Sequence, residues 1–205
     1  MEWAVFMAVD RFQRRFSVIS HSIIPAFARL RSVILAAVMI RRLSVFFGVL
    51  IGAMWMGEVL LGNLGDTSVL GNLRTLHFPV YRVAAYSFVF GALAFTALAG
   101  FYTAYRTGSA RAAIRVAIWS GLISGAITLV TLVGMTAVFL DALRQSPSDL
   151  AEFAKSGDQN VSHFLYVDAL GGGLNHLWIG AGLGAALGSI GAFFGRPFYR
   201  EKAHS

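Results

Sequence analysis

The stretch 168–196, DALGGGLNHLWIGAGLGAALGSIGAFFGR, decides the fold of this chain. Between its two terminal charges the only ionisable side chain is that of His176. The stretch is long and apolar enough to span a bilayer. Glycines recur within it at every fourth position, Gly180, Gly184 and Gly188, so one helix face is small enough to pack closely against other helices. These features predict an integral membrane protein.

The composition of the whole chain agrees with a membrane location. Of its 205 residues 57% are hydrophobic and 13% are charged, with a mean hydropathy of +0.66. Soluble domains have about 45–50% apolar and 25% charged residues. The absence of cysteine excludes disulfides, thiolate metal ligands and a cysteine nucleophile. The net charge of +7 does not indicate nucleic-acid binding, because the arginines flank apolar spans rather than form one basic domain.

The sequence predicts an all-α fold, in which residues 43–205 form a bundle of four transmembrane helices. The apolar spans cover about residues 43–64, 83–105, 116–140 and 169–195. In the third span, Gly121 and Gly125 form a second pair of small residues spaced by four. We interpret the glycines as a zipper that packs helices within one chain. The alternative is a seam between copies of the chain in a homo-oligomer.

Residues 1–42 form a basic N-terminal segment. Val9, Phe12 and Phe16 would share one face of a helix, which favours an interfacial amphipathic helix in the headgroup layer. The alternative is that translation starts at Met39 and that the preceding residues are an over-extended start. No small-residue cleavage site follows a short apolar core, so we do not expect a removable signal peptide.

The longest loop, residues 141–168, is expected to contain a short helix. Ser146 would cap this helix, Pro147 would occupy its first turn, and Asp149 would complete a capping box. The glycines at 171–173 then allow a bend or a late start of the last span.

The placement of basic residues predicts the orientation. One side would hold Arg11, Arg14, Arg15, Arg29, Arg31, Arg41, Arg42, Arg106, Arg111, Arg115, Arg196, Arg200 and Lys202. The other side would hold Arg74, Arg82, Arg144 and Lys155. The first side is therefore expected to be cytoplasmic, with both termini inside. Compact loops and the absence of targeting signals favour a bacterial inner membrane.

A polar set toward the outer side is the candidate functional site. Glu58 is the only charge in the first span, and helix rise places it at a depth similar to that of His176 in the antiparallel fourth span. Asn175 and Asp168 lie close to His176 in sequence. A carboxylate at this depth needs a partner, water or a proton, and His176 is the natural partner. The pair is interpreted either as a polar clasp that fixes helix register or as a proton or cation site entered from outside.

Motifs of other site classes are absent or weak. The sequence has no phosphate loop, zinc-protease motif or nucleophile elbow, and no strand precedes the glycine-rich run, which excludes a dinucleotide site. A metal site formed by His77, His163 and His176 with Asp168 has no ligand spacing to support it. We therefore predict no metal and no other cofactor.

The leading functional hypothesis is a non-enzymatic accessory, assembly or regulatory subunit, with lipid and either a partner membrane protein or a second copy as its contacts. The alternative is a small oligomeric transporter or channel with Glu58 and His176 on its path. Intramembrane catalysis ranks third, because no nucleophile or metal set accompanies these two residues.

Overall fold

The structure, a computed structural model, describes residues 34–204, with side chains described as far as residue 199. These residues form the Ile34–Leu64 helix, η1 (Ser68–Leu70), α2 (Leu73–Leu76), α3 (Phe78–Thr107), α4 (Ala110–Val138), α5 (Leu140–Leu143), α6 (Pro147–Ser156) and α7 (Val161–His204). The chain divides into two units, Met1–Ile40 and Arg41–Ser205, and the description below concerns the second. The predicted N-terminal amphipathic helix falls on residues outside the described range.

Four of the helices are long and apolar enough to cross a membrane: Ile34–Leu64, Phe78–Thr107, Ala110–Val138 and Val161–Tyr199. The predicted all-α fold with four packed transmembrane helices is confirmed. All four helices begin before the predicted apolar span, and α3 and α7 also end after it, because a helix continues into polar residues while its backbone bonds remain satisfied. At the start of α3, Pro79 takes the first turn, where a missing N–H group leaves no bond unmade.

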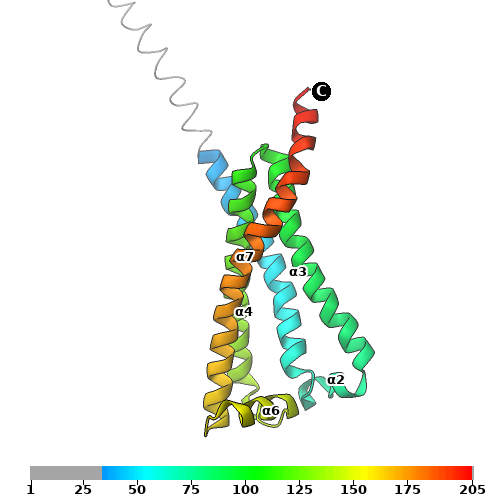
Figure 1. Cartoon of the computed structure of the whole chain (residues 1–205), viewed down its shortest axis with the longest axis vertical. Coiled ribbons are helices and arrows are strands. Elements are labelled where there is room, and N and C mark those ends of the chain that lie inside the picture. The colour runs from blue at the N-terminus through cyan, green and yellow to red at the C-terminus, as the bar shows by residue number, and fades with distance from the viewer. Residues whose placement is uncertain (1–33, 205) are drawn as a thin grey trace, which may run out of the picture. The chain divides into compact units, whose positions relative to one another are not determined.

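Helices α4 and α7 are antiparallel, and α7 lies along α4 for much of its length (Figure 1). At the centre of this contact the backbones of Gly121 and Gly180 touch. A β-carbon placed on Gly180 would lie 2.5 Å from the carbonyl oxygen of Gly121. One turn away, a β-carbon on Gly125 would lie 2.7 Å from the Cα atom of Leu177. The two helices can therefore approach this closely only because these positions lack side chains.

Gly188 of α7 is the point at which three helices meet. A β-carbon on Gly100 of α3 would lie 2.7 Å from the Cα atom of Gly188. A β-carbon on Gly188 would in turn overlap the Cβ atom of Ala117 on α4. Beyond this point α7 packs on α3, where Gly191 faces the carbonyl oxygen of Ala97. In Figure 1, α3 approaches α7 here and diverges from it toward α2.

The Ile34–Leu64 helix packs against α4 and α3 through glycines of its own. β-Carbons on Gly48 and Gly52 would collide with the side chains of Ile123 and Ile127. On the side facing α3, a β-carbon on Gly57 would lie 2.5 Å from the ring of Phe88. Large side chains of α3 and α4 therefore lie over the glycines of this helix, and this contact completes the four-helix bundle.

The start of α7 differs from the expectation. The glycines at 171–173 lie within a continuous helix that begins at Val161, so the expected bend or late start is wrong. The helix begins earlier because Asn160 caps it, its Oδ1 atom accepting hydrogen bonds from the backbone N–H groups of Ser162 and His163 at 2.9 and 3.2 Å. Helical structure then continues through the glycines because it pairs their backbone groups, which would be costly to leave unpaired near lipid.

The short helix in the long loop is α6, as the sequence predicts. The Ser146 hydroxyl accepts a hydrogen bond from the N–H group of Asp149 at 3.4 Å, Pro147 takes the first position, and Gly157 ends the helix with φ of 76°. The reciprocal half of the capping box does not form, because the N–H group of Ser146 donates to the carbonyl oxygen of Leu143 instead.

Substitution of Gly184 tests the close contact of α4 and α7. A β-carbon on Gly184 would lie 2.8 Å from the carbonyl carbon of Ala117 and 2.9 Å from the Cα atom of Ile118. We expect Gly184→Leu to lower the free energy of unfolding in detergent by about 1–3 kcal/mol through overpacking. Gly182 on the same helix has nothing within 4 Å of such a β-carbon, so Gly182→Leu is the matched control and should leave thermal stability unchanged. Equal melting temperatures for the two variants would contradict the packing.

Candidate functional site

Glu58 lies in the half of the first helix that runs toward α2 and α6, and its side chain is half-buried. A β-carbon on Gly62, one turn further along the helix, would lie 3.9 Å from the Oε1 atom of Glu58. His176 of α7 is its electrostatic neighbour from the opposite side of the bundle. The structure therefore brings these two predicted site residues together.

His176 is held by its own helix and by the first helix. Its Nδ1 atom lies 2.8 Å from the carbonyl oxygen of Gly172. Because a carbonyl can only accept, Nδ1 carries the proton and donates, which leaves Nε2 with a free lone pair in the neutral ring. The ring of Trp55 meets the imidazole edge to face, with centroids 5.5 Å apart, and fixes its orientation.

No hydrogen bond or ion pair joins Glu58 to His176 within the described part of the chain. The structure thus brings the two groups near each other without a bond, and Nδ1 of the imidazole donates its proton to the carbonyl oxygen of Gly172. Chemically, the pair supplies a carboxyl group and an imidazole lone pair within electrostatic range. Such a pair can hold or exchange one proton, whereas no covalent chemistry follows from it.

Asp168 and Asn175 do not join the Glu58–His176 pair. Both side chains are exposed and line a groove of about 480 Å³ at the surface of α7. The other lining residues include Asp158 and Gly172. Since Gly172 also holds the His176 ring, one helical turn separates the groove from the intramembrane pair.

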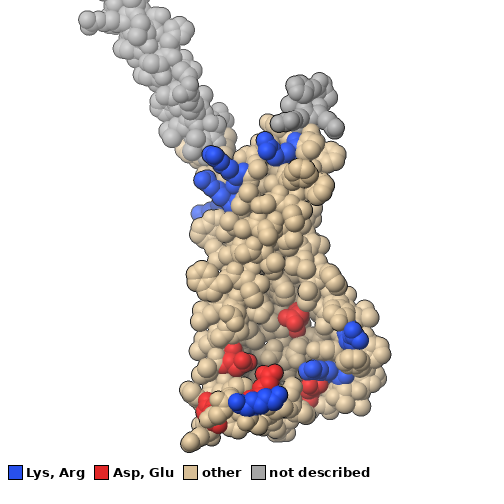
Figure 2. Space-filling model, viewed as in Figure 1, with Lys and Arg blue, Asp and Glu red and all other residues tan. Residues whose placement is uncertain are grey.

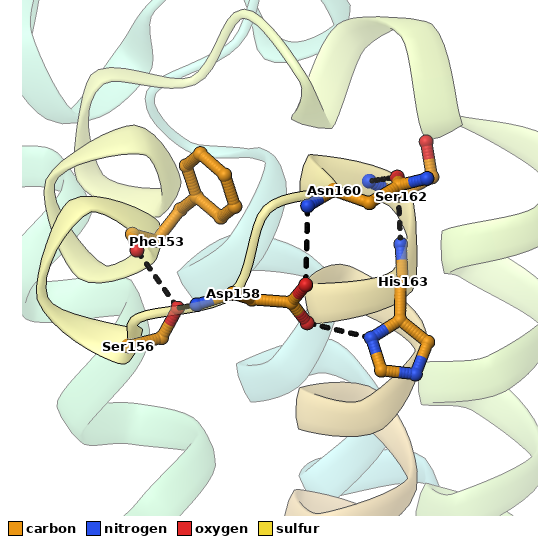
Figure 3. Close-up of polar contacts among 6 residues, drawn as sticks. All are labelled: Phe153, Ser156, Asp158, Asn160, Ser162 and His163. Atoms are coloured by element: carbon orange, nitrogen blue, oxygen red, sulfur yellow. Dashed lines mark hydrogen bonds and ion pairs between the residues drawn. The ribbon is translucent and has the colours of Figure 1, made fainter.

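A set of hydrogen bonds fixes the junction between α6 and α7 beside this groove (Figure 3). The carboxylate of Asp158 accepts from the N–H group of Asn160 at 3.1 Å and pairs with the His163 ring at 2.6 Å. The Ser156 hydroxyl donates to the carbonyl oxygen of Phe153 and accepts from the N–H group of Asp158. These bonds to His163 and Asn160 hold the pKa of Asp158 below its usual value.

Asp149 on α6 is a residue of the site region that sequence reasoning assigned only to a cap. Its Oδ2 atom is buried and has no hydrogen-bond partner among the described residues. Burial raises the pKa of Asp149 to about 6, the Ser146 hydroxyl partly opposes this, and the nearby carboxylates of Glu152, Asp168 and Asp66 raise it further. No local sequence signal marks this effect, because it arises from side chains on three separate segments.

The histidines proposed as metal ligands are not gathered. His163 pairs with Asp158, His176 is bonded to Gly172, and His77 precedes α3 in a different loop. Within residues 34–199 no group of three His, Asp or Glu side chains is arranged to hold a metal ion.

The pKa of Asp149 predicts a pH dependence of stability. Its pKa of about 6 in the folded protein exceeds the value near 4 expected when unfolded, so the folded state binds more protons between these values. Stability should therefore fall as the pH rises from about 4 to about 6 and remain lower above it. Asp149→Asn should remove this loss and stabilise the protein at pH 7.5 by about 1 kcal/mol after solvent screening.

Melting curves of the two proteins at pH 4.5 and pH 7.5 check this. At pH 4.5 the wild-type carboxyl group is largely protonated, so the two melting temperatures should nearly coincide. A variant that is less stable than wild type at pH 7.5 would show that the carboxylate makes a favourable bond. Glu152→Gln, which removes a more exposed charge of the same helix, is the matched control and should have the smaller effect.

Comparison with protein-family models, with curated proteins and with solved structures finds no match for this chain.

Proposed function

We propose that this chain is a non-enzymatic accessory, assembly or regulatory subunit of a membrane complex. The observation that carries the proposal is the contact between α4 and α7, where Gly121 meets Gly180 backbone to backbone. A contact of this kind leaves no space for a substrate or for water between the two helices. It favours a rigid scaffold over a path through the bundle.

The polar side chains of the spans support the same role. Hydroxyl groups of α3 and α4 donate to carbonyl oxygens of their own helices, as Thr103 does to Ala99 at 2.7 Å and Thr128 to Ser124 at 3.0 Å. A hydroxyl group bonded in this way has its hydrogen-bond donor paired within its own helix, so it does not indicate an ion pathway. The Ser120 hydroxyl additionally reaches the carbonyl oxygen of Ser44, which ties α4 to the first helix.

The exposed faces of α4 and α7 are apolar and available to lipid or to the helices of a partner. Trp178 is 77% exposed and Val130 is 72% exposed. Contact with the lipid bilayer follows from the four apolar helices. Contact with a partner membrane protein, or with a second copy of this chain, is part of the proposal.

A second candidate function is a small oligomeric transporter or channel. The observation that favours it is the position of Glu58 beside His176, with the groove of Asp168 and Asn175 one helical turn away. A proton entering from the groove would meet the imidazole before the carboxyl group. Beyond this pair, however, the contact of α4 with α7 is closed by Gly121 and Gly180.

Ion flux in liposomes separates the two functions. We expect liposomes containing the purified chain to hold proton and potassium gradients as long as protein-free liposomes, because the helix contacts exclude water. Rapid decay of a gradient, abolished by Glu58→Gln with an unchanged melting temperature, would contradict the accessory role. His176→Gln serves as the matched change at the neighbouring group.

The same proposal predicts a defined complex in native membranes. After mild extraction, the chain should migrate in a complex larger than any formed by the purified chain. Migration at the same size in both preparations would remove the support for a partner protein.

We further propose that both termini face the cytoplasm, in a bacterial inner membrane. Support comes from the basic end of the bundle, defined by Arg41, Arg42, Arg106, Arg111, Arg115 and Arg196. The opposite end carries Arg74, Arg82, Arg144 and Lys155 together with carboxylates (Figure 2). An excess of arginine in short segments beside the spans marks the cytoplasmic side.

Reporter fusions test this orientation. A reporter inserted at Gly108, between α3 and α4, or fused after Ser205 should read as cytoplasmic, and one inserted at Gly157 should read as external. Gly108 and Gly157 both lie at helix ends with positive φ, so the two insertions are structurally matched. An external signal from Gly108 would reverse the orientation.

A further inference from the structure

A groove of about 580 Å³ lies between the beginning of α4 and the last turns of α7. Its walls are Ala110 and Ile114 of α4 and Ser189, Ala192 and Phe193 of α7, and Arg196 also lines it. This volume is within the usual range of ligand pockets. The groove is thus apolar along most of its length and carries one cationic side chain.

The groove is open on the outer surface of the helix bundle. Ser189 and Arg196 are exposed, and Phe193 is 74% exposed. The space arises because small side chains face each other where the helices separate. Gly188, the residue immediately before Ser189, still meets Ala117 of α4, and the groove begins next to that contact.

The groove has a direction along the bundle. Gly188 lies beside Ile114, since a β-carbon on the glycine would be 3.8 Å from the Cα atom of Ile114. Helix rise then places Arg196 about 12 Å further toward the basic end. Arg196 is therefore closer to the basic end of the bundle than Ser189 and Phe193 of the apolar walls are.

The positive charge at this end has no carboxylate to neutralise it among residues 41–199. The acidic residues in this range are Glu58, Asp66, Asp141, Asp149, Glu152, Asp158 and Asp168, which belong to the other half of the bundle. Figure 2 shows the same separation on the face in view. No ion pair joins Arg196 to another described side chain, nor Arg111 or Arg115 on the first turns of α4. An anion beside Arg196 must therefore come from outside residues 41–199.

We propose that this groove holds one anionic phospholipid, with its phosphate at Arg196 and an acyl chain against Ile114 and Phe193. A basic pocket between transmembrane helices at the level of the headgroups fits the phosphate of such a lipid. The apolar walls below the arginine fit the chain attached to it. A free phosphate would use the arginine but leave these walls exposed.

The test is a titration of the purified full chain in mild detergent, with bound lipid counted by native mass spectrometry. The probes are dioleoyl phosphatidylglycerol, which is anionic, and dioleoyl phosphatidylcholine, which has the same chains and no net charge. We expect one phosphatidylglycerol molecule to bind at least fivefold more tightly than phosphatidylcholine. Equal affinity for the two lipids would overturn the proposal.

Two variants separate the groove from general surface charge. Arg196→Gln should weaken phosphatidylglycerol binding about fivefold. Arg106→Gln removes a charge at the same end but outside the groove, where the guanidinium lies 5.8 Å from the ring of Tyr102, and should bind as wild type does. An equal loss of phosphatidylglycerol affinity in the two variants would show that only general surface charge attracts the lipid, and would contradict a binding site in the groove.

Ser189→Phe tests the apolar part without changing any charge. Ser189 is exposed and its hydroxyl bonds only the carbonyl oxygen of Ala185, so the bundle should stay folded while the groove is filled. We expect binding to weaken at least fivefold. Unchanged binding, or displacement of phosphatidylglycerol by 10 mM inorganic phosphate, would show that the headgroup charge alone is recognised and would contradict a lodged lipid. Without added lipid, Arg196→Gln and Ser189→Phe should melt at the same temperature as wild type, which shows that neither substitution weakens binding by unfolding the protein.

Discussion

The meeting of α3, α4 and α7 at Gly188 is the constraint on which the rest of the bundle depends. Lipid offers no hydrophobic drive for helices to associate, so van der Waals contact of the backbones must supply much of the attraction. Gly188 makes such van der Waals contacts with two neighbours, Gly100 on α3 and Ala117 on α4. The position of Gly188 sets how the three helices are arranged. On one side of it α7 runs along α4, and on the other side it packs on α3.

Close backbone contact also explains how the polar groups of the spans are distributed. Where α4 and α7 touch, no room remains for a polar side chain of one helix to reach the other. The hydroxyl groups accordingly turn back, and Ser124 and Thr128 bond carbonyl oxygens of α4 itself. His176 does the same through Gly172, and it lies near Glu58 without bonding to it. Tight packing thus sets the chemistry available to the candidate site.

The sequence predicted the class of fold because a membrane span leaves a strong apolar signal. It also placed Glu58 and His176 at a common depth, because helix rise is constant. It did not predict whether the two side chains would bond, since rotation about the helix axis depends on packing at positions such as Gly125. The early start of α7 has a local signal in Asn160, a preferred capping residue, whose Oδ1 atom accepts from the N–H group of Ser162.

The two ends of the bundle satisfy their charges in different ways. At the end carrying α6, Asp66 pairs with Arg74 at 3.1 Å and Asp158 pairs with His163, so much of the charge is balanced within the chain. At the basic end the arginines of residues 41–199 have no carboxylate beside them, and Arg106 rests on the ring of Tyr102. Charges left unpaired by the fold must be balanced by water, ions or lipid phosphates. The basic end therefore depends on its surroundings for charge balance, whereas the end carrying α6 balances much of its charge within the chain.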